Sequence, residues 1–212
     1  MTRHGICTPK CFFLFRKKGS QNVHIAALII SWINKAFSLE KMQPKIKNII
    51  LVGLMGSGKT TIGRRLSENL SLDFFDSDHE IIDTTGVSID HIFDVEGEKG
   101  FRARESEVIK KLCATPNIVL ATGGGAVILK ENRELIKKAG SVVYLSSSVD
   151  QILRRTAKSK TRPLLEKSKN RRKTITDILE ARDPLYKEVA SVIINTNGKK
   201  LNEVIDEIIE TL

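Results

Sequence analysis

The sequence has few aromatic side chains, few cysteines and no long apolar run. Aromatic residues make up 5% of the 212 residues, which disfavours a protein that binds nucleic acid by stacking bases on its side chains. Three cysteines, at positions 7, 11 and 113, cannot build a disulfide framework. The most apolar run of the N-terminal segment, residues 25–33, is only nine residues long and too short to cross a bilayer. We therefore expect a cytoplasmic protein with no membrane association.

The positive charge is concentrated near the N-terminus. Residues 1–41 hold seven Lys or Arg and one Glu, giving +6, so residues 42–212 contribute only +4 of the total +10. The charge of the main body therefore does not indicate a nucleic-acid partner. Residues 1–41 lack a small-residue cleavage site, which makes them a poor secretory signal and a weak transit peptide. We expect a basic extension that is non-catalytic or poorly ordered, with Met42 as an alternative start.

From residue 47 onward, short β-branched runs alternate with amphipathic stretches. Strands are predicted at 48–54, 73–77, 117–122, 141–147 and 191–196. Helices are predicted at 59–70, 105–113, 131–140, 149–156, 175–183 and 201–212. Such alternation indicates one α/β domain over residues 42–212, in three layers, with a five-stranded parallel sheet flanked by helices. Ligands are expected at the carboxyl ends of the strands.

One stretch departs from the alternation. Residues 158–174 hold eight Lys or Arg and one acid, Glu166, and Pro163 interrupts any helix. Most charge runs of this kind are solvated loops. This one follows the fourth strand–helix unit and can therefore lie over the strand ends, so we predict a mobile basic lid over an anionic ligand, at about residues 156–174.

The strongest motif is GLMGSGKT at residues 53–60. It matches the P-loop pattern G-x-x-x-x-G-K-[ST] between a predicted strand and a predicted helix. The glycines let backbone amides converge on phosphate, Lys59 reaches the β- and γ-phosphates, and the Thr60 hydroxyl completes a Mg²⁺ shell. These features predict a P-loop NTPase fold. No guanine-reading Asn-Lys-x-Asp follows, so a GTPase is disfavoured, and the chain is small for a motor or helicase. A small kinase fits best.

Carboxylates, arginines and glycines are available for an acceptor. Asp76 and Asp78 follow the second strand and would face one side if the extended backbone continued, although such acids can also simply cap a helix. Arg102 lies beside Glu98 and Glu105, a pattern typical of a surface ion pair. Three successive glycines, 123–125, allow close backbone approach to a ligand. Arg182 lies near a helix end predicted at Pro184.

Together these motifs resemble the shikimate kinases in order and approximate spacing, over about residues 46–212. The matching segments are GLMGSGKTTIGRRL, FFDSD, GEKGFRARE, ATGGGAV, TRPLL and ARDPLY. The resemblance implies a nucleoside-monophosphate-kinase-like fold. It also implies transfer of the ATP γ-phosphoryl group to the 3-hydroxyl of shikimate, a step of aromatic amino-acid biosynthesis.

For ATP and Mg²⁺, the resemblance implies that Thr60 binds the metal and that Asp76 contacts it through water. Arg155 would pack against adenine, and Arg162 of the lid would stabilise the transferring phosphate. Lys199 takes the place of an arginine that covers adenine in many members, and it cannot stack as a planar guanidinium does. The P-loop residues implied to bind ATP are Gly56, Ser57, Gly58, Lys59, Thr60 and Thr61.

For shikimate, the resemblance implies that Arg102 and Arg182 clamp the carboxylate, that Asp78 binds the hydroxyls, and that Gly124 contacts the substrate. The residues implied to be catalytic are Lys59, Asp78 and Arg162. Two alternatives remain: a P-loop kinase for another small polyol such as gluconate, and an ATP-binding RNA-associated protein. We expect a monomer whose partners are ATP and shikimate, without nucleic acid.

Overall fold

The structure is a computed structural model and describes residues 48–157 and 170–212. The chain divides into two units, Met1–Lys45 and Ile46–Leu212. The predicted extension over residues 1–41 lies outside the described residues, as does most of the predicted lid, including Arg162. Within the described ranges, none of the helices combines the length and apolar character needed to span a membrane.

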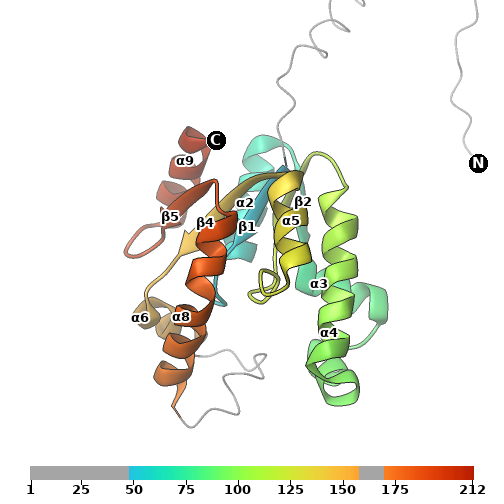
Figure 1. Ribbon diagram of the computed structural model, residues 1–212. Helices are drawn as coiled ribbons and strands as arrows, with labels where there is room; N and C mark the ends of the chain where they lie inside the picture. The colour runs from blue at the N-terminus through green and yellow to red at the C-terminus, as the bar shows by residue number, and fades with distance from the viewer. Residues whose placement is uncertain (1–47, 158–169) are drawn as a thin grey trace, which may run out of the picture. The chain divides into compact units, whose positions relative to one another are not determined.

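Five parallel strands form the sheet at the centre of the described unit (Figure 1). Their order is β2-β3-β1-β4-β5, with β1 in the middle. In that central strand Ile50 pairs with Leu120 on one side and Val142 on the other. The predicted five-stranded parallel sheet is therefore confirmed. The strands are β1 (Asn48–Val52), β2 (Asp73–Asp76), β3 (Ile118–Ala121), β4 (Gly140–Ser146) and β5 (Val192–Asn195).

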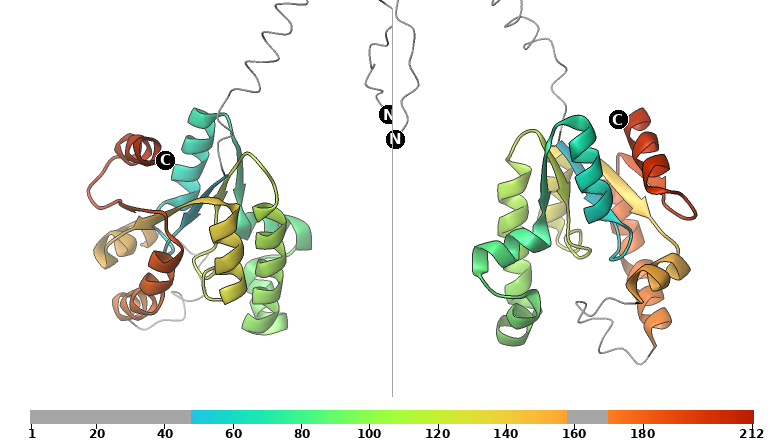
Figure 2. Two further views of the ribbon diagram at one scale, coloured as in Figure 1. Left: turned by 45° about the horizontal axis from the view of Figure 1, so that its top comes forward. Right: turned by 180° about the vertical axis from the view of Figure 1, so that it is seen from behind.

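Helices cover both faces of the sheet, as Figure 2 shows from two further sides. Alternate residues of β1 serve the two faces: Ile49 belongs to the core cluster that includes α2 and α9, and Ile50 to the cluster that includes α4, α5 and α8. The described helices are α2 (Lys59–Leu70), α3 (Ser77–Thr85), α4 (Ile89–Cys113), α5 (Lys130–Ala139), α6 (Val149–Thr156), α8 (Arg171–Val189) and α9 (Leu201–Thr211). The predicted three-layer α/β architecture is confirmed.

Two helix boundaries differ from those predicted. Helix α8 does not end at Pro184 but continues to Val189. Proline removes one backbone hydrogen bond and strains a helix interior. Here Tyr186 and Val189 are buried in the core beyond the proline, and their packing outweighs that cost. The same helix begins at Arg171, so residues 171–174 of the predicted lid are helical, and Thr156 is the last residue of α6.

The segment between β2 and β3 contains more helix than predicted. Helix α3 was not predicted, and α4 begins sixteen residues before the stretch at 105–113. The backbone of α4 is not helical at Gly97, where φ is 68° and ψ is −174°. This left-handed φ needs a glycine, and it bends the helix just before the turn that contains Arg102.

Candidate active site

The P-loop follows β1 and leads directly into α2. Gly53 has φ 143°, and a Cβ there would lie 2.7 Å from the carbonyl oxygen of Leu145, so only glycine fits the turn. Lys59 lies inside the loop with 9% of its surface exposed. Its Nζ donates to the carbonyl oxygens of Gly53 (2.8 Å) and Leu54 (3.1 Å). The ammonium group is thereby held against the backbone that would surround phosphate.

Arg155 connects α6 to this loop. Its Nη1 donates to the carbonyl oxygens of Gly56 (3.3 Å) and Ser57 (2.9 Å) and lies 3.5 Å from Thr196 Oγ1, just after β5. Burial lowers the pKa of Arg155, and neighbouring Arg154 lowers it further. The guanidinium therefore lies between the P-loop and the end of β5, two of the segments predicted to bind ATP.

Lys199 lies differently. It belongs to the connection between β5 and α9, and its Nζ is 2.5 Å from Glu207 Oε2 on α9. About a third of the Lys199 side chain is exposed, at 34%. The Lys199 side chain, which was predicted to contact adenine, therefore points toward α9.

Asp76 joins β2 to the first turn of α2. One of its carboxylate oxygens, Oδ2, accepts from Thr60 Oγ1 at 2.7 Å, and the other, Oδ1, accepts from the backbone N–H of Asp78 at 3.1 Å. The second bond makes Asp76 the N-cap of α3. Asp76 therefore caps a helix, which was the plainer interpretation of acids after a strand, and it also contacts Thr60 of the P-loop motif.

The extended backbone does not continue from Asp76 to Asp78. The chain becomes helical at Ser77, so Asp78 lies in the first turn of α3 and the period-two argument for its direction is wrong. Ser77 is fully buried, and its Oγ accepts from the N–H of Gly123 at 2.7 Å. A Cβ on Gly123 would lie 2.5 Å from Asp78 Oδ1. The serine therefore ties α3 to the glycine run, which brings Asp78 there.

Arg102 forms the ion pairs that its spacing from Glu98 and Glu105 indicated, but its side chain is mostly buried rather than on the surface. Its side chain is 12% exposed, and Nη1 donates to Glu105 Oε2 at 2.7 Å, while Nη2 donates to Glu98 Oε1 at 3.1 Å. A Cβ on Gly125 would lie 2.3 Å from Arg102 Nη1, so the glycine makes room for the guanidinium. Burial opposes the charge of Arg102, but Glu105 and Glu98 raise its pKa above the usual range.

Glu105 was missed as a functional residue. It is 1% exposed, and its Oε1 has no hydrogen-bond partner within the described part of the chain. Burial raises the pKa of its carboxyl group; Arg102 lowers it and Asp78 raises it further. That oxygen also lies 2.9 Å from where a Cβ on Gly123 would be. The sequence offered only a helical spacing of three from Arg102 as a signal.

Arg182 reaches the glycine run from the opposite side. Its Nη1 donates to the carbonyl oxygen of Gly124 at 3.2 Å. Gly124 is also close to the P-loop, because a Cβ there would lie 3.3 Å from the amide nitrogen of Met55. The P-loop, Asp78, Arg102 and Arg182 thus all lie close to the glycine run. Arg162, predicted to stabilise the transferring phosphate, lies outside the described residues.

This arrangement combines two kinds of binding surface. The P-loop offers amides and an ammonium group to phosphate, with a hydroxyl and a carboxylate next to it. Beside it, guanidinium groups from α4 and α8 and a carboxylate from α3 surround the glycines. Guanidinium groups bind carboxylates in two-point contacts, and a carboxylate accepts from hydroxyls. The chemistry suits phosphoryl transfer to a small anionic alcohol.

Comparison with known proteins decides the family. Residues 55–212 match the family model described as shikimate kinase.

The chain belongs to the shikimate kinase family.

Curated relatives agree with this assignment over most of their length. A shikimate kinase from Pseudomonas paraeruginosa is 49% identical over 165 residues, which cover 78% of this chain and 95% of that protein. Another, from Thioalkalivibrio sulfidiphilus, is 50% identical over 161 residues, covering 76% of this chain and 84% of that protein. As a member of this family the chain is an ATP-dependent kinase, so the predicted enzyme class is confirmed.

Solved structures place the fold in the same group. A shikimate kinase from Acinetobacter baumannii, solved in complex with shikimate, is 48% identical with a TM-score of 0.76, covering 78% of this chain and 92% of that one. A gluconokinase from Sinorhizobium meliloti has a TM-score of 0.53 but only 15% identity, covering 80% of this chain and 93% of that one, which shows a shared fold alone. The gluconate and RNA alternatives are therefore not favoured.

Proposed function

We propose that this protein transfers the γ-phosphoryl group of ATP to the 3-hydroxyl of shikimate. The observation that carries the proposal is the convergence of Arg102, Arg182 and Asp78 on the glycine run, beside a P-loop, in a chain of the shikimate kinase family. Shikimate has one carboxylate and several neighbouring hydroxyls, and these side chains offer a complementary partner to each.

The ATP site is built on the P-loop. Backbone amides from Gly56 to Thr61 surround the phosphates. When ATP binds, the Lys59 ammonium group leaves the carbonyl oxygens of Gly53 and Leu54 and donates to phosphate oxygens instead. Arg155 already contacts the loop, which supports its assignment to the ATP site, where it would pack against adenine. Lys199 would have to leave Glu207 to reach the nucleotide, so we assign it a minor part. Arg162 of the lid stabilises the transferring phosphate.

Thr60 and Asp76 would hold Mg²⁺. Their oxygens, a hydroxyl and a carboxylate, are 2.7 Å apart at the start of α2. Such oxygen ligands fit magnesium, which is bound in kinases by one or two protein groups together with phosphate oxygens and water. When bound, the ion neutralises charge on the β- and γ-phosphates.

Three side chains position the acceptor. Arg102 and Arg182 hold the shikimate carboxylate, and the Gly124 backbone lies against the ring. Asp78 accepts a hydrogen bond from the 3-hydroxyl of shikimate and so orients the hydroxyl oxygen toward the γ-phosphorus of ATP. A bond forms between the hydroxyl oxygen and the γ-phosphorus as the bond from this phosphorus to the β,γ-bridging oxygen breaks. The hydroxyl proton passes to Asp78. Little deprotonation is needed before transfer, because the transition state is loose.

We further propose that the enzyme works as a cytoplasmic monomer on ATP and shikimate, without a nucleic-acid partner. Residues 42–212 form the catalytic domain, and residues 1–41 are a non-catalytic extension.

The position of the phosphate group on the product tests the central proposal. Incubation with ATP, Mg²⁺ and shikimate is expected to give a phosphate ester whose phosphorus couples to the proton on C3 in NMR spectra. An ester on another carbon, or no ester, would refute it.

A further inference from the structure

One carbonyl oxygen in the acceptor site accepts two hydrogen bonds from α8. Gly124 O receives Arg182 Nη1 at 3.2 Å and Tyr186 Oη at 2.5 Å. Residues four positions apart on a helix lie on the same face, so α8 presents both donors to this oxygen at once. A carbonyl oxygen has two lone pairs and can accept both.

Tyr186 is a fixed donor. Its side chain is fully buried, and its ring stacks on that of Tyr144 with centroids 5.0 Å apart. Burial raises the pKa of Tyr186 to about 12, while Arg182 works in the opposite direction. The hydroxyl is therefore protonated at neutral pH and donates to the carbonyl. The stacked ring leaves it little freedom to turn elsewhere.

Arg182, by contrast, has a choice of partners. Its guanidinium carries five N–H donors, and one of them is spent on Gly124 O. A substrate carboxylate competes for these donors with the advantage of its charge. If Arg182 turns from the carbonyl to the substrate, Gly124 O loses one of its two donors. Without the Tyr186 hydroxyl, Gly124 O would then have neither of its two side-chain donors. A partly buried acceptor left unpaired is unfavourable, so binding of the substrate carboxylate to Arg182 would be weaker.

We propose that Tyr186 is a positioning residue of the acceptor site, which keeps Gly124 O paired and so frees Arg182 for the substrate carboxylate. The inference rests on the proposed function and adds a residue to it. Gly124 also lies against the P-loop backbone near Met55.

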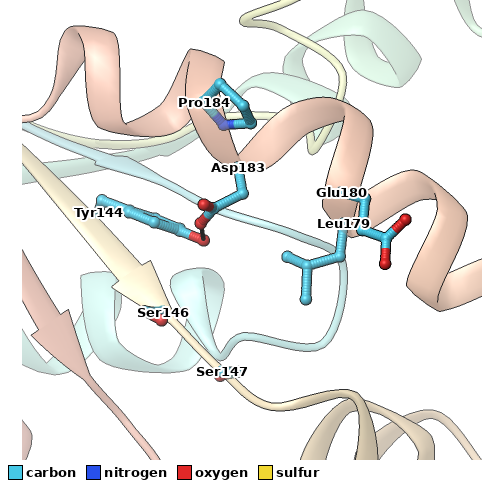
Figure 3. Close-up of a pocket in the computed structure, with 7 residues that line it drawn as sticks. All are labelled: Tyr144, Ser146, Ser147, Leu179, Glu180, Asp183 and Pro184. Carbon is cyan, nitrogen blue, oxygen red and sulfur yellow. Dashed lines mark hydrogen bonds between the residues drawn. The ribbon is translucent and has the colours of Figure 1, made fainter.

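The chain contains a matched control in Tyr144. This tyrosine is equally buried and belongs to the same stacked pair, but its hydroxyl donates to Asp183 Oδ1 at 2.8 Å. Figure 3 shows Tyr144 and Asp183 together with the other side chains that line a pocket. The pocket lies between β4 and α8 and has a volume of about 470 Å³. Removing either hydroxyl deletes a partly buried hydrogen bond, and of the two hydroxyls that of Tyr186 is the one that contacts the glycine run.

The test compares Tyr186→Phe with Tyr144→Phe in steady-state kinetics. We expect Tyr186→Phe to raise the KM for shikimate about fivefold, the effect of one lost hydrogen bond, with kcat and the KM for ATP within about twofold. Tyr144→Phe should leave the KM for shikimate unchanged. Equal KM values for shikimate in Tyr186→Phe and the parent enzyme would overturn the proposal. So would an equal loss of ATP and shikimate binding, because that pattern indicates a role in folding only.

A double-mutant cycle with Arg182→Lys tests the connection directly. If Tyr186 acts through Arg182, the Tyr186→Phe effect on the KM for shikimate should shrink to less than about twofold in the Arg182→Lys background. Additive effects would overturn the proposal. Failure of the proposed function is distinguishable, because the parent enzyme itself would then show no turnover with shikimate.

Discussion

Thr60 Oγ1 donates a hydrogen bond of 2.7 Å to Asp76 Oδ2, joining the first turn of α2 to the end of β2. The other oxygen of Asp76 caps α3 through the N–H of Asp78. One carboxylate therefore faces the proposed Mg²⁺ position and at the same time starts the helix that carries the acceptor-binding aspartate. These two roles can be separated by substitution.

Asp76→Asn should raise the Mg²⁺ concentration needed for half-maximal activity with little change in stability, since Asn caps helices about as well as Asp. Asp76→Ala should do the same and also lower the free energy of unfolding by about 1 kcal/mol through the lost cap. Magnesium titration and denaturant unfolding measure the two effects. Asp73→Asn, at the exposed start of the same strand, is the control. An unchanged Mg²⁺ requirement in Asp76→Asn would contradict the metal assignment.

Glu105→Gln should weaken the hold on Arg102 from inside the protein. Because Glu105 is 1% exposed, losing its charged hydrogen bond should lower the free energy of unfolding by about 1.5–3 kcal/mol and raise the KM for shikimate. Glu98→Gln is the matched control, because Glu98 pairs with the same arginine at 66% exposure and should cost less than about 1 kcal/mol. Equal losses of stability in the two variants would argue against a buried, supporting role for Glu105.

Asp78→Asn should lower kcat at least about tenfold, because an amide cannot take the hydroxyl proton and orients the acceptor less well. The KM for ATP should remain within about twofold of the parent value. Asp83→Asn, an exposed position later in α3, should leave kcat unchanged. Steady-state kinetics with both substrates measures these effects, and a kcat for Asp78→Asn close to the parent value would remove Asp78 from the mechanism.

Deletion of residues 1–41 should leave kcat and both KM values unchanged, because the family match begins at residue 55 and the first of the described strands at Asn48. The parent enzyme and the truncated chain can be compared in the same assay. A clear fall in kcat upon truncation would make the extension part of the enzyme.

Local sequence patterns predicted most of the helices and strands of this protein. The P-loop helix occupies residues 59–70, as expected, because its start is set by the motif itself and its buried face by residues such as Ile62 and Leu66. Strands were also recognised, because buried parallel strands are continuous β-branched runs. The end of α8 was misplaced, since burial of Tyr186 overrides a proline and is invisible in a local window.

The site was predicted less completely, for a related reason. Asp76 and Asp78 were recognised as candidates, but the direction of Asp78 was argued from a strand that ends at Asp76. Ser77 accepts a hydrogen bond from Gly123, which lies 46 positions away in the sequence. Tyr186 likewise bonds Gly124 across 62 positions. Such roles arise only when the sheet brings distant segments together.

Acceptor selectivity tests the central claim most directly. ADP release should be measured with ATP, Mg²⁺ and a panel of acceptors that includes shikimate, gluconate and a nucleoside monophosphate. We predict that shikimate has the highest kcat/KM, and that Arg182→Lys lowers this value without weakening ATP binding, because the carboxylate clamp and the P-loop are separate. Turnover of gluconate or the nucleotide without turnover of shikimate would contradict the account.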